Sequence, residues 1–293
     1  MAAVDRFAVI RQKASDDPNE PKAATGLHFA MSWRSVGRSL ERDQMSHHAI
    51  EFWEYWRGGR ASLRFLGGAP FVLAQIAQTE RGSIQARNLL ERHFSRFLDT
   101  CRVSVSIEGE VPEMGRGCVV CHNETSFADV AAYFVGIWPH IDCLAGADLY
   151  RYFPFARAAC RRVDIELIAR GNRKATDPLV ERMVSIVKQG GRVGWGAEGK
   201  LSGIDGIGPF KVGGSLIAIR AQVPVVPVII HGGHHAMPLG TFRAHSGEIR
   251  IRFCEPVSTK GYAEADARAF ADRLQADFVR NYNELSARRK DVS

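Results

Sequence analysis

The sequence predicts an α/β protein with a mixed, largely parallel sheet flanked by helices and preceded by an N-terminal helical segment. From about residue 101, short segments rich in Val and Ile alternate with longer amphipathic segments. This alternation is typical of strands joined by helices that cover the sheet. In addition, 45% of the 293 residues are hydrophobic, which suffices for the core of one large domain.

The first hundred residues have a different pattern. Residues 1–45 are polar and charged, and we expect a poorly ordered arm or short helices there. Residues 46–100 predict helices interrupted at two glycine-containing sites, Gly58-Gly59 and Gly67-Gly68-Ala69-Pro70. The aromatic cluster in FWEYW suits either a core or a membrane interface. We therefore divide the chain into an arm (1–45), a helical segment that could associate with a membrane (46–100) and an α/β domain (101–293).

The α/β domain opens with two expected strands. RVSVSIEGE alternates apolar and polar residues, as a half-buried strand does, whereas GCVVC is apolar throughout, as a fully buried strand is. SFADVAAYFVGI then predicts a helix, and DIELIARG a strand. ATDPLVERMVSIVKQGG predicts a helix with Thr176 or Asp177 as N-cap, Pro178 in its first turn and Gly190 at its end.

The second half of the domain continues the alternation. RVGWGAEG begins as a strand and ends in glycines, and GGSLIAIRAQ predicts a helix. VPVVPVIIHG and GEIRIRFCEPV predict two further strands because each is rich in β-branched residues. The C-terminal segment EADARAFADRLQADFVRNYNEL predicts an amphipathic helix with Phe270, Leu274 and Phe278 on one face.

Charge and hydropathy narrow the classes of partner. The net charge of +7 favours anionic partners such as phosphorylated molecules, an anionic membrane or nucleic acid, although it could serve solubility alone. We expect no nucleic-acid binding, because the basic residues are spread along the chain without a binding motif. The apolar run FLGGAPFVLAQIA is too short to span a bilayer but suits an interface or a core. We therefore expect a cytoplasmic protein that binds peripherally to the cytoplasmic face of a membrane.

The six cysteines predict buried free thiols in a reducing compartment. Cys118 and Cys121 have a spacing that zinc sites use, but three steps along a strand place their side chains on opposite faces. We expect neither a metal nor a cofactor.

A first junction between strand and helix carries candidate catalytic residues. Ser126 and Asp129 match the S-x-x-D capping pattern, so capping of the following helix is a sufficient explanation for both. The same junction also contains His122, Asn123 and Glu124. Because His122 and Glu124 are two residues apart, extended backbone would point both the same way, and either could act as a general base beside Asp129.

Two more junctions are rich in glycine or basic residues. Residues 194–214 contain eight glycines together with Glu198, Lys200, Ser202 and Lys211. Glycines let backbone amides approach an anion, and lysines add charge, although a flexible surface loop is the alternative. Residues 169–177 carry Arg170, Arg173 and Lys174, which suit either an anion site or a solvated turn.

The order of these segments resembles the glycerolipid acyltransferase family, the lysophosphatidate-acyltransferase-like group. VVCHNETSFADV resembles its N-H-x-S-x-x-D block, IELIARGNRKA its I-x-R block, GAEGKLSGIDGIGPFKVGG its P-E-G-T-R-S and G-x-F-K-x-G blocks, and VPVVPVIIHG its V-P-x-x-P-V strand. The resemblance covers roughly residues 100–255. It implies transfer of a fatty acyl group from acyl-CoA or acyl carrier protein to a lysophospholipid or related lipid acceptor.

The resemblance also implies roles for individual residues. Asp129 matches the Asp that orients the family's base, and Asn123 and Ser126 match their counterparts and are expected to bind substrate. The remaining matches, expected to bind the acceptor, are Arg170, Glu198, Gly199 and Lys211, with Lys200 and Ser202 beside them. Glu124 stands where the family has its catalytic His, and Leu201 where it has an Arg that grips phosphate.

The altered base leaves three alternatives. Glu124 could be the base itself, although a carboxylate is a weaker base than imidazole at neutral pH. His122 could replace the missing His. In the third alternative catalysis is lost, and the chain is an impaired lipid-binding relative on the same fold.

Overall fold

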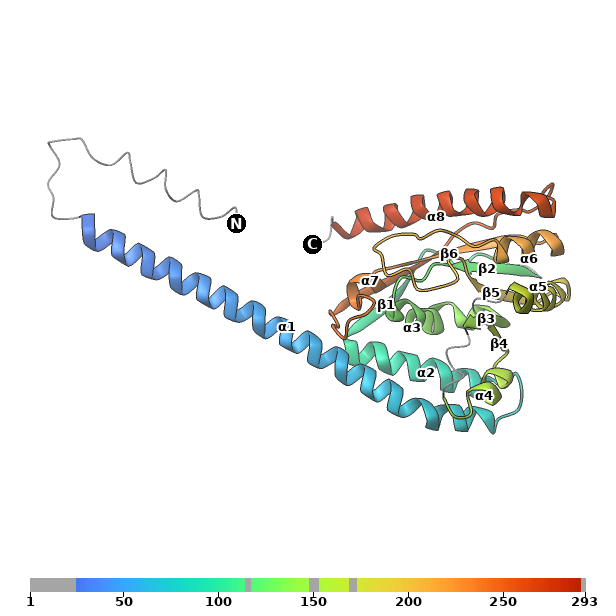
Figure 1. The fold of residues 1–293 in the computed structure, drawn as a ribbon, viewed down its shortest axis with the longest axis horizontal. Helices are drawn as coiled ribbons and strands as arrows, with labels where there is room; N and C mark the ends of the chain where they lie inside the picture. The colour runs from blue at the N-terminus through green and yellow to red at the C-terminus, as the bar shows by residue number, and fades with distance from the viewer. Residues whose placement is uncertain (1–24, 114–116, 148–152, 169–172, 291–293) are drawn as a thin grey trace. The chain divides into compact units, whose positions relative to one another are not determined.

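The computed structural model describes residues 25–113, 117–147, 153–168 and 173–290 (Figure 1). The chain divides into two compact units, Met1–Glu51 and Phe52–Ser293. Helix α1 (Thr25–Ala77) begins in the first unit and ends in the second, so the boundary expected at residue 45 lies inside a continuous helix. The features below belong to the second unit.

The sheet is mixed and largely parallel, as the sequence predicts. The described strands form a single seven-stranded sheet in the order β1-β7-β6-β2-β5-β3-β4. Neighbouring strands are parallel except β6 and β7, which pair antiparallel. Strand β2 is central and buried along its whole length, so its carboxyl end opens between β5 and β6. The strands are β1 (Val103–Glu108), β2 (Cys118–His122), β3 (Cys143–Ala147), β4 (Ile165–Ile168), β5 (Arg192–Gly196), β6 (Val225–His231) and β7 (Gly247–Phe253).

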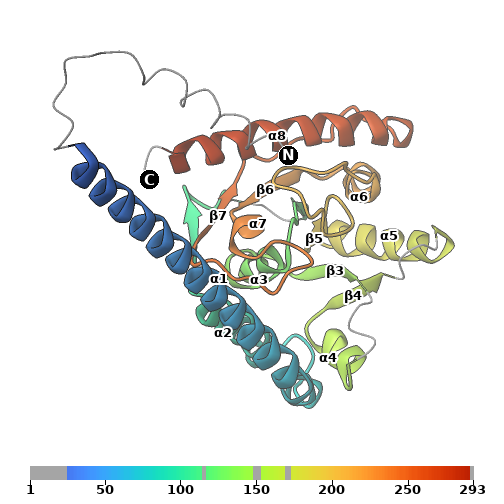
Figure 2. The same cartoon turned by 60° about the vertical axis from the view of Figure 1, so that its left-hand side comes forward.

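Helices cover both faces of the sheet (Figures 1 and 2). One apolar core joins the sheet to α2, α3 and α4 and to the second half of α1, and the other joins it to α5, α6 and α8. Cys118 belongs to the first core and Cys121 to the second, so these two thiols lie on opposite faces, as expected. The helices are α2 (Ile84–Cys101), α3 (Phe127–Gly136), α4 (Ala156–Arg162), α5 (Arg173–Lys188), α6 (Gly213–Ala221), α7 (Gly233–Ala236) and α8 (Ala267–Lys290).

The prediction that glycines interrupt the N-terminal helices is wrong. Helix α1 runs unbroken through both glycine-containing sites and contains Pro70. A buried stripe that includes Ala61, Leu73 and Ile76 packs against the rest of the unit. This packing outweighs the weak helix propensity of glycine, which costs only about 1 kcal/mol per residue.

Other boundaries also differ from the sequence prediction. Helix α5 begins at Arg173, so Thr176 and Asp177 lie within it rather than at its N-cap, and Pro178 lies inside the helix. Strand β3 and helix α4 are not predicted by the sequence patterns. Both are short, and β3 (CLAGA) consists mainly of small residues without the β-branched side chains that indicate strands.

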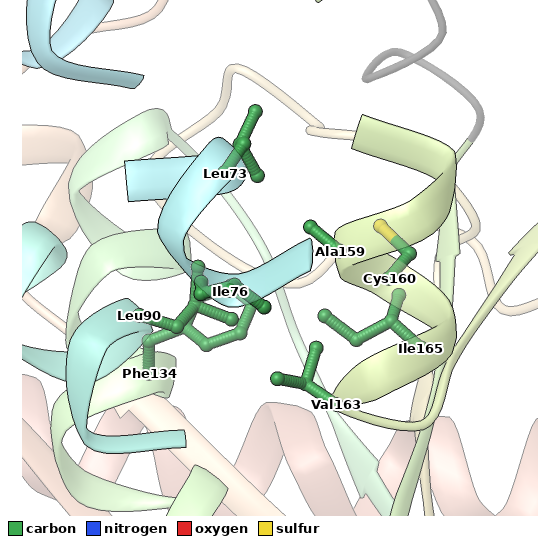
Figure 3. A pocket seen from close by; sticks show the side chains of 8 residues that line it. All are labelled: Leu73, Ile76, Leu90, Phe134, Ala159, Cys160, Val163 and Ile165. Carbon is green, nitrogen blue, oxygen red and sulfur yellow. The ribbon is translucent and has the colours of Figure 1, made fainter. Parts of the chain in front are cut away.

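A small apolar cavity lies within the first core (Figure 3). Ile76 of α1, Leu90 of α2, Phe134 of α3 and Val163 before β4 all contribute to its wall. The polar residues of the β2–α3 junction do not line this cavity. It is therefore separate from the candidate site.

Candidate functional site

The turn after β2 is fixed to the neighbouring strand by Asn123. The Asn123 side chain is buried, its Nδ2 donates to the carbonyl of Ile230 (2.9 Å), and its Oδ1 accepts from the Ile230 amide (2.8 Å). Both ends of the side-chain amide are therefore used by strand β6. Asn123 was expected to contact substrate, and in this structure it holds the turn against the sheet.

Ser126 and Asp129 form the predicted capping box at the start of α3. Ser126 Oγ accepts from the Ala128 amide, and Asp129 Oδ2 accepts from the amides of Thr125 (2.8 Å) and Ser126 (3.1 Å). The Thr125 hydroxyl adds a third hydrogen bond to the same oxygen at 2.5 Å. The capping explanation for these residues is thus confirmed, and Thr125 is a participant that the sequence analysis missed.

The second oxygen of Asp129 faces a different element. Oδ1 is buried and has no hydrogen-bond partner within the described part of the chain. It lies against Gly233 at the start of α7, where a Cβ would sit 1.7 Å from it. Burial raises the pKa of Asp129 to about 6, despite the hydrogen bonds from Thr125 and Ser126. Any residue with a Cβ at position 233 would collide with the Asp129 carboxylate, so only glycine fits there without displacing it.

His122 and Glu124 contact one another. His122 Nε2 lies 3.0 Å from Glu124 Oε1, which confirms that the two side chains point the same way. The His122 side chain is 1% exposed and the Glu124 side chain is 23% exposed. The Tyr133 ring packs against the imidazole with 4.3 Å between centroids. Glu124 is therefore the member of the pair that solvent or a substrate can reach, with His122 behind it.

Glu198 connects the glycine-rich loop to this turn. Its buried carboxylate accepts from the Glu124 amide (3.2 Å) and from the Gly208 amide (2.5 Å). Burial raises its pKa to about 7, and the nearby carboxylates of Glu124 and Asp129 add to the increase. Glu198 was expected to bind the acceptor, and here both of its oxygens are bonded to backbone amides.

Two further hydrogen bonds bring the loop onto the same turn. The Ser202 amide donates to the carbonyl of Glu124 (3.0 Å), and the Gly203 amide donates to that of Thr125 (2.9 Å). Ser202 Oγ is buried without a partner among the described residues. The first and second junctions therefore form one site at the carboxyl ends of β2 and β5.

The basic residues of the site lie at its surface. Lys200 and Lys211 are exposed, and a Cβ at Gly199 would touch the Lys211 side chain at 3.3 Å. Gly199 has a φ of +68°, which favours glycine. Arg170, from the third junction, lies outside the described residues.

Strand β6 ends in a second polar cluster that the sequence analysis did not single out. Asp205 of the glycine-rich loop accepts from the Tyr282 hydroxyl at 2.8 Å and lies 3.1 Å from His235 Nε2. The buried His231 ring packs 4.9 Å from the Tyr282 ring. The run HGGHH after a strand rich in valine and isoleucine is the signal that could have indicated this cluster.

Comparison with known proteins agrees with the fold and with the order of the motifs. The model of the Acyltransferase family matches residues 102–231. A putative 1-acyl-sn-glycerol-3-phosphate acyltransferase of Caenorhabditis elegans is 27% identical over 175 residues, which are 59% of this chain and 61% of the relative. The human 1-acyl-sn-glycerol-3-phosphate acyltransferase alpha is 33% identical over 78 residues, 27% of this chain and 28% of the relative.

A solved structure has the same fold. The crystal structure of the 1-acyl-sn-glycerophosphate acyltransferase PlsC from Thermotoga maritima matches with a TM-score of 0.60 and 22% identity, over 81% of this chain and 96% of that one. The seven-stranded sheet and its flanking helices therefore form an α/β fold like that of this acyltransferase. The chain is therefore similar in sequence to the Acyltransferase family over residues 102–231 and similar in fold to that PlsC.

The chain spans 61% and 28% of the lengths of these two curated relatives. None of the described helices is long and apolar enough to cross a bilayer.

Proposed function

We propose that this protein transfers a fatty acyl group from a thioester donor, acyl-CoA or acyl carrier protein, to the hydroxyl of a lysophospholipid of the lysophosphatidate type. The observation that carries this proposal is the partly exposed Glu124 carboxylate, hydrogen-bonded to His122 and adjoining the loop after β5. In the sequence motif, Glu124 stands at the position where the acyltransferase family has its catalytic His. The names of the relatives support a lysophosphatidate as acceptor.

Glu124 acts as the general base in this proposal. The acceptor hydroxyl attacks the thioester carbonyl while its proton passes to Glu124, and the C–S bond then breaks with return of that proton to the departing thiolate. The products are the acylated lipid and a free thiol. His122 Nε2 holds Oε1 of Glu124, which leaves Oε2 to meet the hydroxyl. A positioned base contributes roughly 10² to 10⁴ in rate.

Asp129 has a supporting role in this proposal. In the family the Asp orients a His, and here its Oδ2 instead binds three donors of its own turn. Asp129 therefore fixes the backbone of Thr125 and Ser126, which directly follow Glu124. His122, which comes from the end of β2, supplies the side chain that orients the base.

The acceptor's phosphate would bind at the surface of the glycine-rich loop. Leu201 replaces the family's Arg and cannot bind an anion, whereas Lys200 and Lys211 are exposed nearby. Single lysines act as point charges rather than as bidentate donors. We therefore expect weaker selectivity for phosphate than a site containing Arg would have.

A membrane surface would supply the acceptor. Helix α1 exposes Trp53, Trp56, Leu63 and Phe71, and such side chains enter the interface between headgroups and acyl chains. We propose peripheral attachment at the cytoplasmic face of the membrane.

The test is acyl transfer by the purified full chain. We expect consumption of acyl-CoA or acyl carrier protein with lysophosphatidate as acceptor, and a loss of roughly 10² or more in kcat for Glu124→Gln. Glu255→Gln, at an exposed position in the loop after β7, is the matched control and should keep its activity. Vesicle binding without any transfer to a panel of lysolipids would contradict the proposal and support an impaired lipid-binding relative.

A further inference from the structure

Exposed apolar side chains project from two loops beside the candidate site. Ile204 of the glycine-rich loop and Leu239 and Phe242 of the loop after α7 are each between 44% and 62% exposed. A Cβ at Gly203 would lie 3.2 Å from the Leu239 side chain, so the two loops touch. Because the Gly203 amide bonds to the carbonyl of Thr125, Ile204 and Leu239 lie near the turn that carries Glu124, and Phe242 lies on the same loop as Leu239.

The loop after α7 is held firmly on helix α1. A Cβ at Gly58 would meet the carbonyl oxygen of Phe242 at 1.8 Å, so the two backbones are in direct contact. The Ala244 amide donates to the carbonyl of Glu54 (3.1 Å), and Arg243 pairs with the Glu54 carboxylate (2.7 Å). Phe242 is thus exposed on an anchored loop next to helix α1.

The charges around these side chains favour an anionic surface. Residues 52–77, 199–211 and 232–246 contain six Lys or Arg residues but only two carboxylates, Glu54 and Asp205. Glu54 forms an ion pair with Arg243 and lies 2.9 Å from His245 Nδ1, and Asp205 lies 3.1 Å from His235 Nε2. Scattered exposed apolar residues are common, whereas a group of them within a basic surface is typical of a membrane-binding site.

We propose that Ile204, Leu239 and Phe242 form a membrane-docking rim that inserts into the headgroup region of an anionic phospholipid bilayer. The loop that carries Leu239 and Phe242 contacts α1 at Gly58 and Glu54, and the loop that carries Ile204 contacts the turn after Glu124. Docking therefore places the turn that carries Glu124 close to the lipid surface. The idea that docking aids catalysis rests on the proposed acyl transfer. The idea that the rim binds a membrane does not depend on that activity.

Vesicle partition of the full chain tests the rim. The variants are Phe242→Ser and Leu239→Ser, and the probe is vesicles of phosphatidylglycerol and phosphatidylcholine. Each substitution should weaken partition into the vesicles by about tenfold, because each removes one of the three apolar side chains that would insert into the bilayer. Phe155→Ser is the matched control, since Phe155 is 57% exposed against 62% for Phe242 but lies at the start of α4, beside the edge strand β4. It should partition like the wild type.

The outcomes separate the rim from the enzymatic proposal. The proposal of the rim is wrong if Phe242→Ser binds vesicles as strongly as the wild type does. It is also wrong if Phe155→Ser loses as much vesicle binding as Phe242→Ser does. Unchanged turnover of Phe242→Ser on a monomeric short-chain lysolipid, together with lost vesicle partition, supports it and shows that the site is intact. If the wild type transfers no acyl group but its partition still depends on Phe242, the enzymatic proposal fails and the rim stands.

Discussion

At the scale of residues, the site contains three carboxylates in three different environments. Glu124 is partly exposed and bonded to His122, Asp129 is bonded to its own turn, and Glu198 is bonded to the amides of Glu124 and Gly208. The sequence predicts these residues through their order in the motifs. It could not predict the bonding of Glu198, because the direction of a side chain after a strand end depends on the loop that packs over it.

The pKa of Glu198 has a measurable consequence for stability. Its pKa is about 7 in the folded protein and near 4.5 in the unfolded chain, so between these values the folded state binds more protons. The free energy of unfolding therefore falls as the pH rises from about 4.5 to 7, by roughly 3 kcal/mol from this group. Asp129 adds a similar fall up to a pH of about 6.

Glu198→Gln should remove the Glu198 part of this pH dependence. Chemical denaturation at pH 5 and pH 8 measures it as the difference between the two free energies of unfolding. We expect a smaller difference in the variant than in the wild type, even though the variant also loses one hydrogen bond at both pH values. Identical differences in the two proteins would show that Glu198 ionises normally in the folded state.

At the scale of elements, helix α1 shows where local sequence is a poor guide. Gly58 and Gly59 both weaken a helix in isolation, yet the helix continues through them because one of its faces packs on the α/β unit. The two glycines differ in their surroundings. A Cβ at Gly58 would meet the Phe242 carbonyl, whereas a Cβ at Gly59 would meet nothing within 4 Å.

This difference predicts opposite effects of the same substitution. Gly59→Ala should raise the free energy of unfolding by about 0.5–1 kcal/mol, because alanine favours the helix. Gly58→Ala should lower it by about 1–3 kcal/mol, because the loop that carries Phe242 must move away. Thermal or chemical denaturation of both variants is the measurement. Stabilisation by both substitutions would mean that the loop does not pack on α1 as described.

The strands were easier to predict than the short connecting elements. β2, β6 and β7 are rich in valine and isoleucine, and their register follows from continuous or alternating apolar residues. β3 and α4 lack such a signal, and they are fixed by packing against β4 and β5. The capping box of α3 is predicted because Ser126 and Asp129 lie only three positions apart in the sequence, at the spacing of the capping pattern.

At the scale of the whole molecule, the charge predicts how membrane binding depends on salt. With a net charge of +7, partition onto anionic vesicles should weaken as ionic strength rises from 0.1 to 1 M, because the screening length falls from about 10 to 3 Å. Partition onto neutral phosphatidylcholine vesicles should change little. Sedimentation with both kinds of vesicle measures this. Equal salt dependence for the two would show that charge does not contribute to binding.

The central claim is that His122 and Glu124 act together as the proton-accepting pair of an acyl transfer site. A double-mutant cycle on kcat, with Glu124→Gln, His122→Gln and the combined variant, tests it most directly. If the claim is correct, Glu124→Gln slows transfer by roughly 10² or more, and adding His122→Gln costs little further rate. Full turnover in Glu124→Gln, or losses that simply multiply in the combined variant, would contradict it.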